Sequence, residues 1–218
     1  MMEGKEILYD HYKDTFEQQK GYLAKRDRLT VLLLLDVVLL TGLIYNPNDV
    51  SSKLNTIISA QVDNLMFDFQ VINTGLIIIF FWFSLQYYMV VLQIEKIYKY
   101  IAGCEEKLSE TFTDFDINRE GAYYLKSYPW MKWLADKIFV LGIPIGFIIL
   151  AICKIVTEWQ LATSLKFVDI VFLVLTTLFS LLYISNRMLH EESFSKKTYP
   201  NLNKAERFIG YFRGVHNE

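Results

Sequence analysis

The stretch 71-VINTGLIIIFFWFSLQYYMVVL-92 decides the fold class, because its 22 residues include no charged side chain. A helix of this length covers the ~30 Å of hydrocarbon in a bilayer, at ~1.5 Å of rise per residue. Three further apolar blocks of 17 to 20 residues, each holding at least one charge, are Leu29–Tyr45, Leu134–Cys153 and Phe167–Asn186. The sequence therefore predicts an all-α integral membrane protein with four transmembrane helices.

Lysine and arginine are distributed unequally over the segments outside these blocks. Residues 1–28, 93–133 and 187–218 hold six each, whereas 46–70 and 154–166 together hold three. The positive-inside rule places the richer segments in the cytoplasm. We therefore expect an integral protein of the plasma (inner) membrane with both termini cytoplasmic. A soluble bundle of buried helices, which is the alternative, does not account for this asymmetry.

This orientation divides the chain into five parts. A cytoplasmic N-terminal helix (1–28) precedes the first transmembrane hairpin (29–92), and a cytoplasmic helical extension with an interfacial aromatic segment follows it (93–133). The second transmembrane hairpin (134–186) leads into a cytoplasmic C-terminal tail (187–218). The cytoplasmic parts make up nearly half of the chain, so a substantial folded body can form on that side.

The second transmembrane helix is expected to continue into the cytoplasm. Apolar residues beyond it recur at alternating spacings of three and four, the heptad pattern of helices that pack side by side, and no proline interrupts them. We predict one long helix over about residues 71–110. A similar stripe in the N-terminal tail can pair with it, either within one chain or between subunits. The stripes are Ile94, Ile97, Ile101, Cys104 and Leu108, and Tyr9, Tyr12, Phe16, Gln19 and Leu23.

Two aromatic segments are expected at the membrane surface. Residues 121–133 read GAYYLKSYPWMKW, in which five of thirteen residues are tyrosine or tryptophan. Such a composition favours an interfacial helix or elbow. Residues 204–215 mix aromatic and basic side chains, and we expect them to join the helical bundle or to lie on anionic headgroups.

Each predicted span offers a polar side chain to one layer of the inner leaflet: Asp36, Gln86, Lys137 and Ser180. Ionisable side chains within a membrane are rare and are commonly paired or functional. We expect the Asp36 carboxylate to be held by Gln86 or Lys137, which would bind the helices together. The alternative is that Asp36 lines a path for ions or protons.

The third and fourth spans carry two further signals. Gly142 and Gly146 are four residues apart around Pro144, a spacing that permits close approach of helices and favours an oligomer contact. Asp136 and Asp169 lie near span ends. We expect both of these carboxylates at the membrane interface.

No catalytic or ligand-binding motif is recognisable in the chain. The three histidines are scattered, and there is no Gly-rich phosphate loop, Cys-x-x-Cys pair or nucleophile elbow. The formal net charge of −2 does not indicate a nucleic-acid partner. We therefore predict a protein that is not an enzyme and that binds no cofactor or metal.

Four spans with a heptad-bearing helix and cytoplasmic tails resemble the architecture of membrane sensors and effectors found in bacterial defence systems. The large cytoplasmic body, its heptad stripes and the lack of a catalytic set favour a homo-oligomeric membrane scaffold or sensor whose cytoplasmic helices recruit or regulate a soluble protein, and the resemblance implies a place in a bacterial defence system. A pore-forming or ion-translocating effector that uses Asp36 is the alternative. The lipid bilayer, further copies of the chain and a cytoplasmic protein are then the expected partners.

The predicted orientation can be tested with a cysteine reagent that does not cross membranes. A cysteine introduced at Ser52 should react in intact cells, because the connection 46–70 faces outward. Cys104 should not react, because residues 93–133 face the cytoplasm. Labelling of a cytoplasmic position in sealed cells contradicts the orientation.

Overall fold

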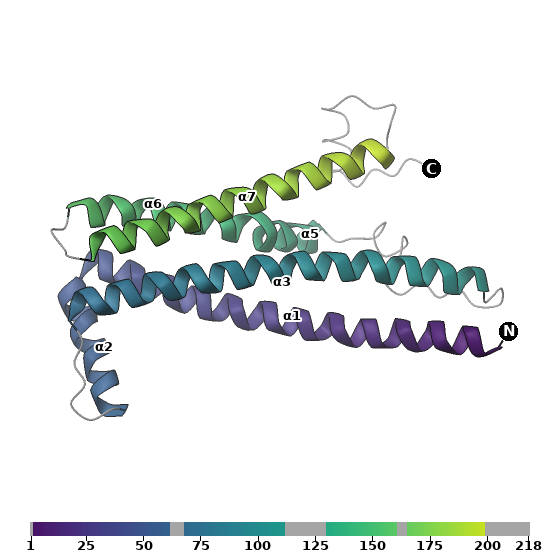
Figure 1. Cartoon of the computed structure of the whole chain (residues 1–218), viewed down its shortest axis with the longest axis horizontal. Helices are drawn as coiled ribbons and strands as arrows, with labels where there is room; N and C mark the ends of the chain where they lie inside the picture. The colour runs from purple at the N-terminus through teal and green to yellow at the C-terminus, as the bar shows by residue number, and fades with distance from the viewer. Residues whose placement is uncertain (1, 62–67, 112–129, 161–164, 199–218) are drawn as a thin grey trace. The chain divides into compact units, whose positions relative to one another are not determined.

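The computed structural model describes residues 2–61, 68–111, 130–160 and 165–198, and every element within these ranges is a helix (Figure 1). Four of the helices are long and apolar enough to cross a membrane. The all-α class and the number of membrane-length helices are thereby confirmed. In chain order the elements are α1 (Met2–Tyr45), α2 (Pro47–Gln61), α3 (Phe69–Thr111), α5 (Trp130–Lys137), a π-helical turn (Ile138–Gly142), α6 (Ile143–Gln160) and α7 (Lys166–Thr198).

Several boundaries differ from the predicted ones. The predicted third span ended at Cys153, but α6 continues to Gln160, because the charged Lys154 that was expected to end the span is buried inside the helix bundle. α7 likewise continues past the predicted end at Asn186. The connection 46–70, expected to be a loop, contains α2.

Pro47 separates α1 from α2. Proline has no amide hydrogen to continue a helix, but it is well suited to the first helical position. The last turn of α1 closes with the Asn46 amide donating to the Gly42 carbonyl at 2.8 Å. A Cβ at Gly42 would meet the Val50 side chain at 3.1 Å, so glycine allows α2 to pack closely on α1.

The chain divides into two structural units. Unit 1 comprises residues 1–24, 91–141 and 183–218, and unit 2 comprises residues 25–90 and 142–182. α1, α3 and α7 each contribute residues to both units without a break in the helix.

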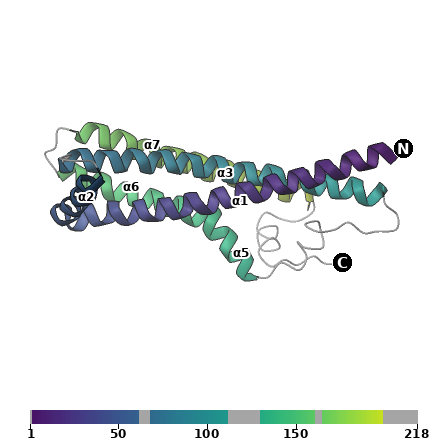
Figure 2. The same ribbon diagram turned by 90° about the horizontal axis from the view of Figure 1, so that it is seen from below.

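Unit 1 is built around the two heptad stripes. The first part of α1 lies antiparallel to the last part of α3 (Figures 1 and 2). The Tyr12 hydroxyl donates to the buried Glu105 carboxylate at 3.1 Å. Tyr9 differs from the expectation, since it is 51% exposed. Ile94 and Gln19 are buried, and Leu23 is half-buried. The stripes therefore pack within one chain, around a core of Tyr12, Ile97, Ile101, Cys104 and Leu108, with Phe16 and Tyr22 against it.

Unit 2 has an apolar core in which aromatic rings meet edge to face. The Phe147 ring of α6 lies 5.1 Å from Phe80 and 6.4 Å from Tyr87, both on α3. Phe81 contacts Phe172 of α7 at 5.4 Å. These contacts bring α3, α6 and α7 together, as edge-to-face pairs do in protein cores.

Two aromatic segments are predicted for the membrane surface. Residues 121–129 of the first segment and all of the second, 204–215, lie outside the described residues. The first segment ends in α5, which begins at Trp130.

The structure also identifies a better probe of orientation. Cys104 is 5% exposed in the core of unit 1, so its failure to react does not report the side of the membrane. Ala102, on the same turn of α3, is exposed. In a variant without the natural cysteines, we expect Ala102→Cys to react only after the membrane is opened, and Ser52→Cys to react in sealed cells.

Candidate functional site

The principal polar cluster of unit 2 is centred on Asn73. Its amide nitrogen donates to Glu158 Oε1 at 2.9 Å and to Asp169 Oδ2 at 3.0 Å. Lys154 completes the cluster, with its ammonium nitrogen 3.2 Å from Glu158 Oε1. Thr74 lies beside Asp169. One amide group thus joins α3, α6 and α7.

These side chains are almost completely withdrawn from the surface. Lys154 and Glu158 are 1% exposed, and Asn73 and Asp169 are 2% exposed. Burying an ionised group is unfavourable unless it is paired and hydrogen-bonded. Each carboxylate here has one bonded oxygen, whereas Glu158 Oε2 and Asp169 Oδ1 have no hydrogen-bond partner within the described ranges. The cluster can therefore accept further positive charge.

Helical spacing explains why these residues meet. The inward faces of the three helices recur every three or four residues, as a helix with 3.6 residues per turn requires. The four residues of the cluster occupy the positions of these faces closest to the helix ends, at the end of unit 2 where α6 stops and α7 begins. The faces are Asn73, Ile77, Phe80, Ser84 and Tyr87 of α3, Phe147, Ala151, Lys154 and Glu158 of α6, and Asp169, Leu173, Thr176 and Ser180 of α7.

Lys166 closes the corner between α6 and α7. Its ammonium group donates to the Trp159 carbonyl at 2.7 Å and lies 5.0 Å from the centre of the Trp159 ring. The carbonyls at the end of a helix have no partner within it, and a cation there is favourable. This contact brings the first turn of α7, which carries Asp169, close to the last turn of α6, which carries Glu158.

Asp36 of α1 is buried without a polar partner in the described residues. It is 4% exposed, and neither carboxylate oxygen has a hydrogen-bond partner in the described part of the chain. The bond expected to Gln86 or Lys137 is therefore not present.

The other members of the predicted polar layer have different surroundings. The Ser180 and Tyr88 hydroxyls lie 2.6 Å apart, and Ser180 also donates to the Thr176 carbonyl. Gln86 is half-buried in unit 2, whereas the half-buried Lys137 belongs to unit 1. Asp36, Gln86, Lys137 and Ser180 thus do not form one hydrogen-bonded layer.

Sequence reasoning missed the charged cluster because it ended the third span too early. Asp169 lies in the first turn of α7, near the end of the span as expected, and its burial on Asn73 was not anticipated. Lys154 and Glu158 were assigned to a loop. Their spacing of four residues, in register with Ala151, is the signal that places them on one buried helix face.

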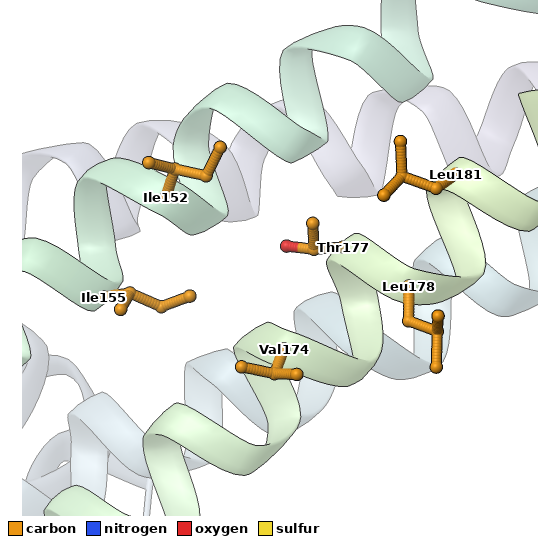
Figure 3. Close-up of a pocket in the computed structure, with 6 residues that line it drawn as sticks. All are labelled: Ile152, Ile155, Val174, Thr177, Leu178 and Leu181. Atoms are coloured by element: carbon orange, nitrogen blue, oxygen red, sulfur yellow. The ribbon is translucent and has the colours of Figure 1, made fainter.

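A separate apolar groove lies between α6 and α7, with a volume of about 270 Å³ (Figure 3). The hydroxyl of Thr177, its one polar side chain, already donates to the Leu173 carbonyl at 3.0 Å. The groove therefore suits hydrocarbon and offers nothing to orient a polar ligand. Its lining consists of Ile152, Ile155, Val174, Thr177, Leu178 and Leu181.

Comparison with known proteins adds no assignment. No protein-family model, curated protein or solved structure matches the chain.

The different surroundings of Asp36 and Asn73 predict opposite effects on stability. A carboxylate within the hydrocarbon costs ~2.5–3.5 kcal/mol on insertion scales. Asp36→Leu removes this unpaired group and leaves no partner behind, so we expect a protein at least as thermally stable as wild type in detergent. Asn73→Leu takes the donor away from two buried carboxylates, so a loss of about 1–3 kcal/mol is expected.

Asp36→Asn and Asn73→Asp are the corresponding near-isosteric variants. The first should behave as Asp36→Leu does, and the second should be less stable than Asn73→Leu, because it adds a third carboxylate. If Asp36→Leu is destabilised as strongly as Asn73→Leu, then Asp36 has a structural partner and this assignment is wrong.

Proposed function

We propose that the protein is a non-enzymatic, homo-oligomeric membrane scaffold or sensor, in which unit 2 lies in the bilayer and unit 1 recruits or regulates a soluble cytoplasmic protein. A place in a bacterial defence system is consistent with this architecture. The observation that carries the proposal is that α1, α3 and α7 each continue unbroken from unit 2 into unit 1.

Unbroken helices provide a physical route between the units. A helix resists bending because its backbone hydrogen bonds are cooperative, so a shift or rotation within the membrane moves the same helix beyond it. Rigid elements of this kind can couple distant sites when they have two arrangements. The route here consists of helices of 44, 43 and 33 residues.

Unit 1 offers a surface for a partner. Tyr98 and Tyr100 stand on either flank of the buried Ile97–Ile101 face and are 39% and 54% exposed, and Ile7 on α1 is 59% exposed. Exposed aromatic side chains outside a membrane are favoured at protein interfaces. Charged residues on the same helices would keep the free surface soluble.

The third span supports association with further copies. Gly142 and Gly146 are exposed, and a Cβ at Gly146 would meet no atom within 4 Å. Among the described residues, no side chain or neighbouring helix covers Gly146. Close packing of small residues against another helix is one way that transmembrane helices associate.

Site-specific photo-crosslinking tests both parts of the proposal in native cells. A photoreactive amino acid at Tyr100 should give a discrete adduct with a soluble protein. The same amino acid at Ile145, which is 47% exposed beside Gly146, should give an adduct at twice the chain mass. Substitution Gly146→Leu should abolish that dimeric adduct, because the added side chain blocks the close approach.

A probe at Lys53 on α2 is the matched control, because it is exposed and is expected outside the cell. The soluble adduct should be absent there. Equal capture from Tyr100 and Lys53 counts against a specific partner, and a monomeric particle by light scattering in detergent counts against the oligomer.

Asp36 supports a second candidate, an ion-translocating effector. Its carboxylate is buried in the bundle without a hydrogen-bond partner in the described residues, as a side chain that handles a cation would be. Liposomes containing the protein should then pass protons or alkali cations, and Asp36→Asn should reduce the flux at least tenfold while still folding. Absence of flux from wild type, or equal flux from the variant, removes this candidate.

A further inference from the structure

The cluster of Asn73, Lys154, Glu158 and Asp169 contains one negative charge more than its own residues can neutralise. Lys154 is paired with Glu158. Lys154 and Glu158 are the charged groups whose fields act on Asp169. The Asn73 amide that donates to Asp169 and the Thr74 hydroxyl that lies beside this carboxylate are both neutral. With both carboxyls ionised, the cluster therefore carries a net charge of −1.

The same cluster has acceptor atoms without donors. The Asn73 amide nitrogen bridges the two carboxylates, so this side chain is directed into the cluster, yet its own oxygen has no hydrogen-bond partner in the described ranges. Glu158 Oε2 and Asp169 Oδ1 are likewise without one. The Thr74 hydroxyl, which also has no partner in the described ranges, lies beside Asp169 and can donate to one of its oxygens. The remaining two buried oxygens, on Asn73 and Glu158, lack a positive or donating group. An amide or carboxylate oxygen is a ligand that hard cations prefer.

We propose that the Asn73–Glu158–Asp169 cluster binds one monovalent cation, which is either a proton or a sodium ion. A single positive charge neutralises the cluster and satisfies acceptors that Lys154 does not reach. A divalent ion would leave the buried cluster with a net positive charge, which is unfavourable for the same reason as the negative one. The site is distinct from Asp36 and is independent of the function proposed above.

The position of the cluster gives a cation a short route to it. Glu158 is two residues before the end of α6, Asp169 is three after the start of α7, and Asn73 is four after the start of α3. At ~1.5 Å per residue, the cluster lies only ~3–6 Å inside the helix ends. Since the three residues come from three helices, the bound cation should stabilise their packing.

Thermal unfolding of the full chain in detergent tests the proposal. Asp36→Asn serves as the reference protein, because it removes the other unpartnered carboxylate of unit 2. Sodium chloride is exchanged for choline chloride at constant ionic strength, at pH 5.5 and at pH 8.5. A ligand present at about ten times its Kd should raise the Tm by about 3 °C for a chain of this size.

Two results support the site and distinguish the cations. If sodium binds, the Tm at pH 8.5 rises saturably with sodium and not with choline. If a proton binds, the Tm is insensitive to sodium and falls by several degrees from pH 5.5 to pH 8.5. The direction follows because a proton held in the folded protein stabilises it at low pH and is lost as the pH rises.

Variants of the cluster provide the control. Asp169→Asn removes the excess charge and should abolish the sodium dependence or the pH dependence seen in the reference protein. Glu158→Gln, which leaves Lys154 and Asp169 as a neutral pair, should do the same and serves where Asp169→Asn does not fold. Glu17→Gln, at an exposed carboxylate of α1, should leave the response unchanged.

The proposal is overturned if the reference protein responds to neither sodium nor pH. It is also overturned if Asp169→Asn or Glu158→Gln folds and keeps the full response, because the cation then binds elsewhere.

Discussion

The need to satisfy every backbone polar group in the absence of water is the constraint on which the structure depends. A membrane-spanning segment meets it by forming a helix, whose amide and carbonyl groups bond within the segment. The four membrane-length helices follow from this requirement. Side chains face the same constraint. A serine can donate to a carbonyl of its own helix, as Ser84 and Ser180 do. The amide and charged side chains on the inward faces need partners on neighbouring helices, and this need joins Asn73 to Glu158 and Asp169.

The two buried carboxylate sites of unit 2 meet this need to different extents. Glu158 and Asp169 share a donor, and Glu158 also has a lysine. Asp36 has no such partner in the described residues. Both sites carry one net negative charge, but the carboxylates of the cluster accept hydrogen bonds from Asn73 and one of them pairs with Lys154, whereas Asp36 bears its desolvation penalty without such a contact in the described residues. The cluster is thus suited to hold the helices together.

The side chains on the surfaces of these helices differ between the two units. Within unit 2 the helices present apolar faces, and within unit 1 α1 and α3 carry exposed charges around a narrow stripe of Ile97, Ile101 and Leu108. The Tyr12–Glu105 bond lies beside this stripe and restricts how α1 and α3 can slide past each other, since displacement would break a hydrogen bond to a buried carboxylate. The same helices therefore contribute an apolar face to unit 2 and a charged surface to unit 1.

The amino-acid sequence by itself determined the class, the number of long apolar helices and the extent of α3, because hydrophobicity and helical spacing are local properties. It also placed Ile97, Ile101, Cys104 and Leu108 on one face of a helix. Tertiary structure decided which polar groups meet. Lys154 looks like the end of a span until α6 is packed against α3, and the hydrogen bond expected between Asp36 and Gln86 is absent from the packed helices. The position of a residue along one helix can be predicted from the sequence, whereas the alignment of two helices depends on the side chains that pack between them.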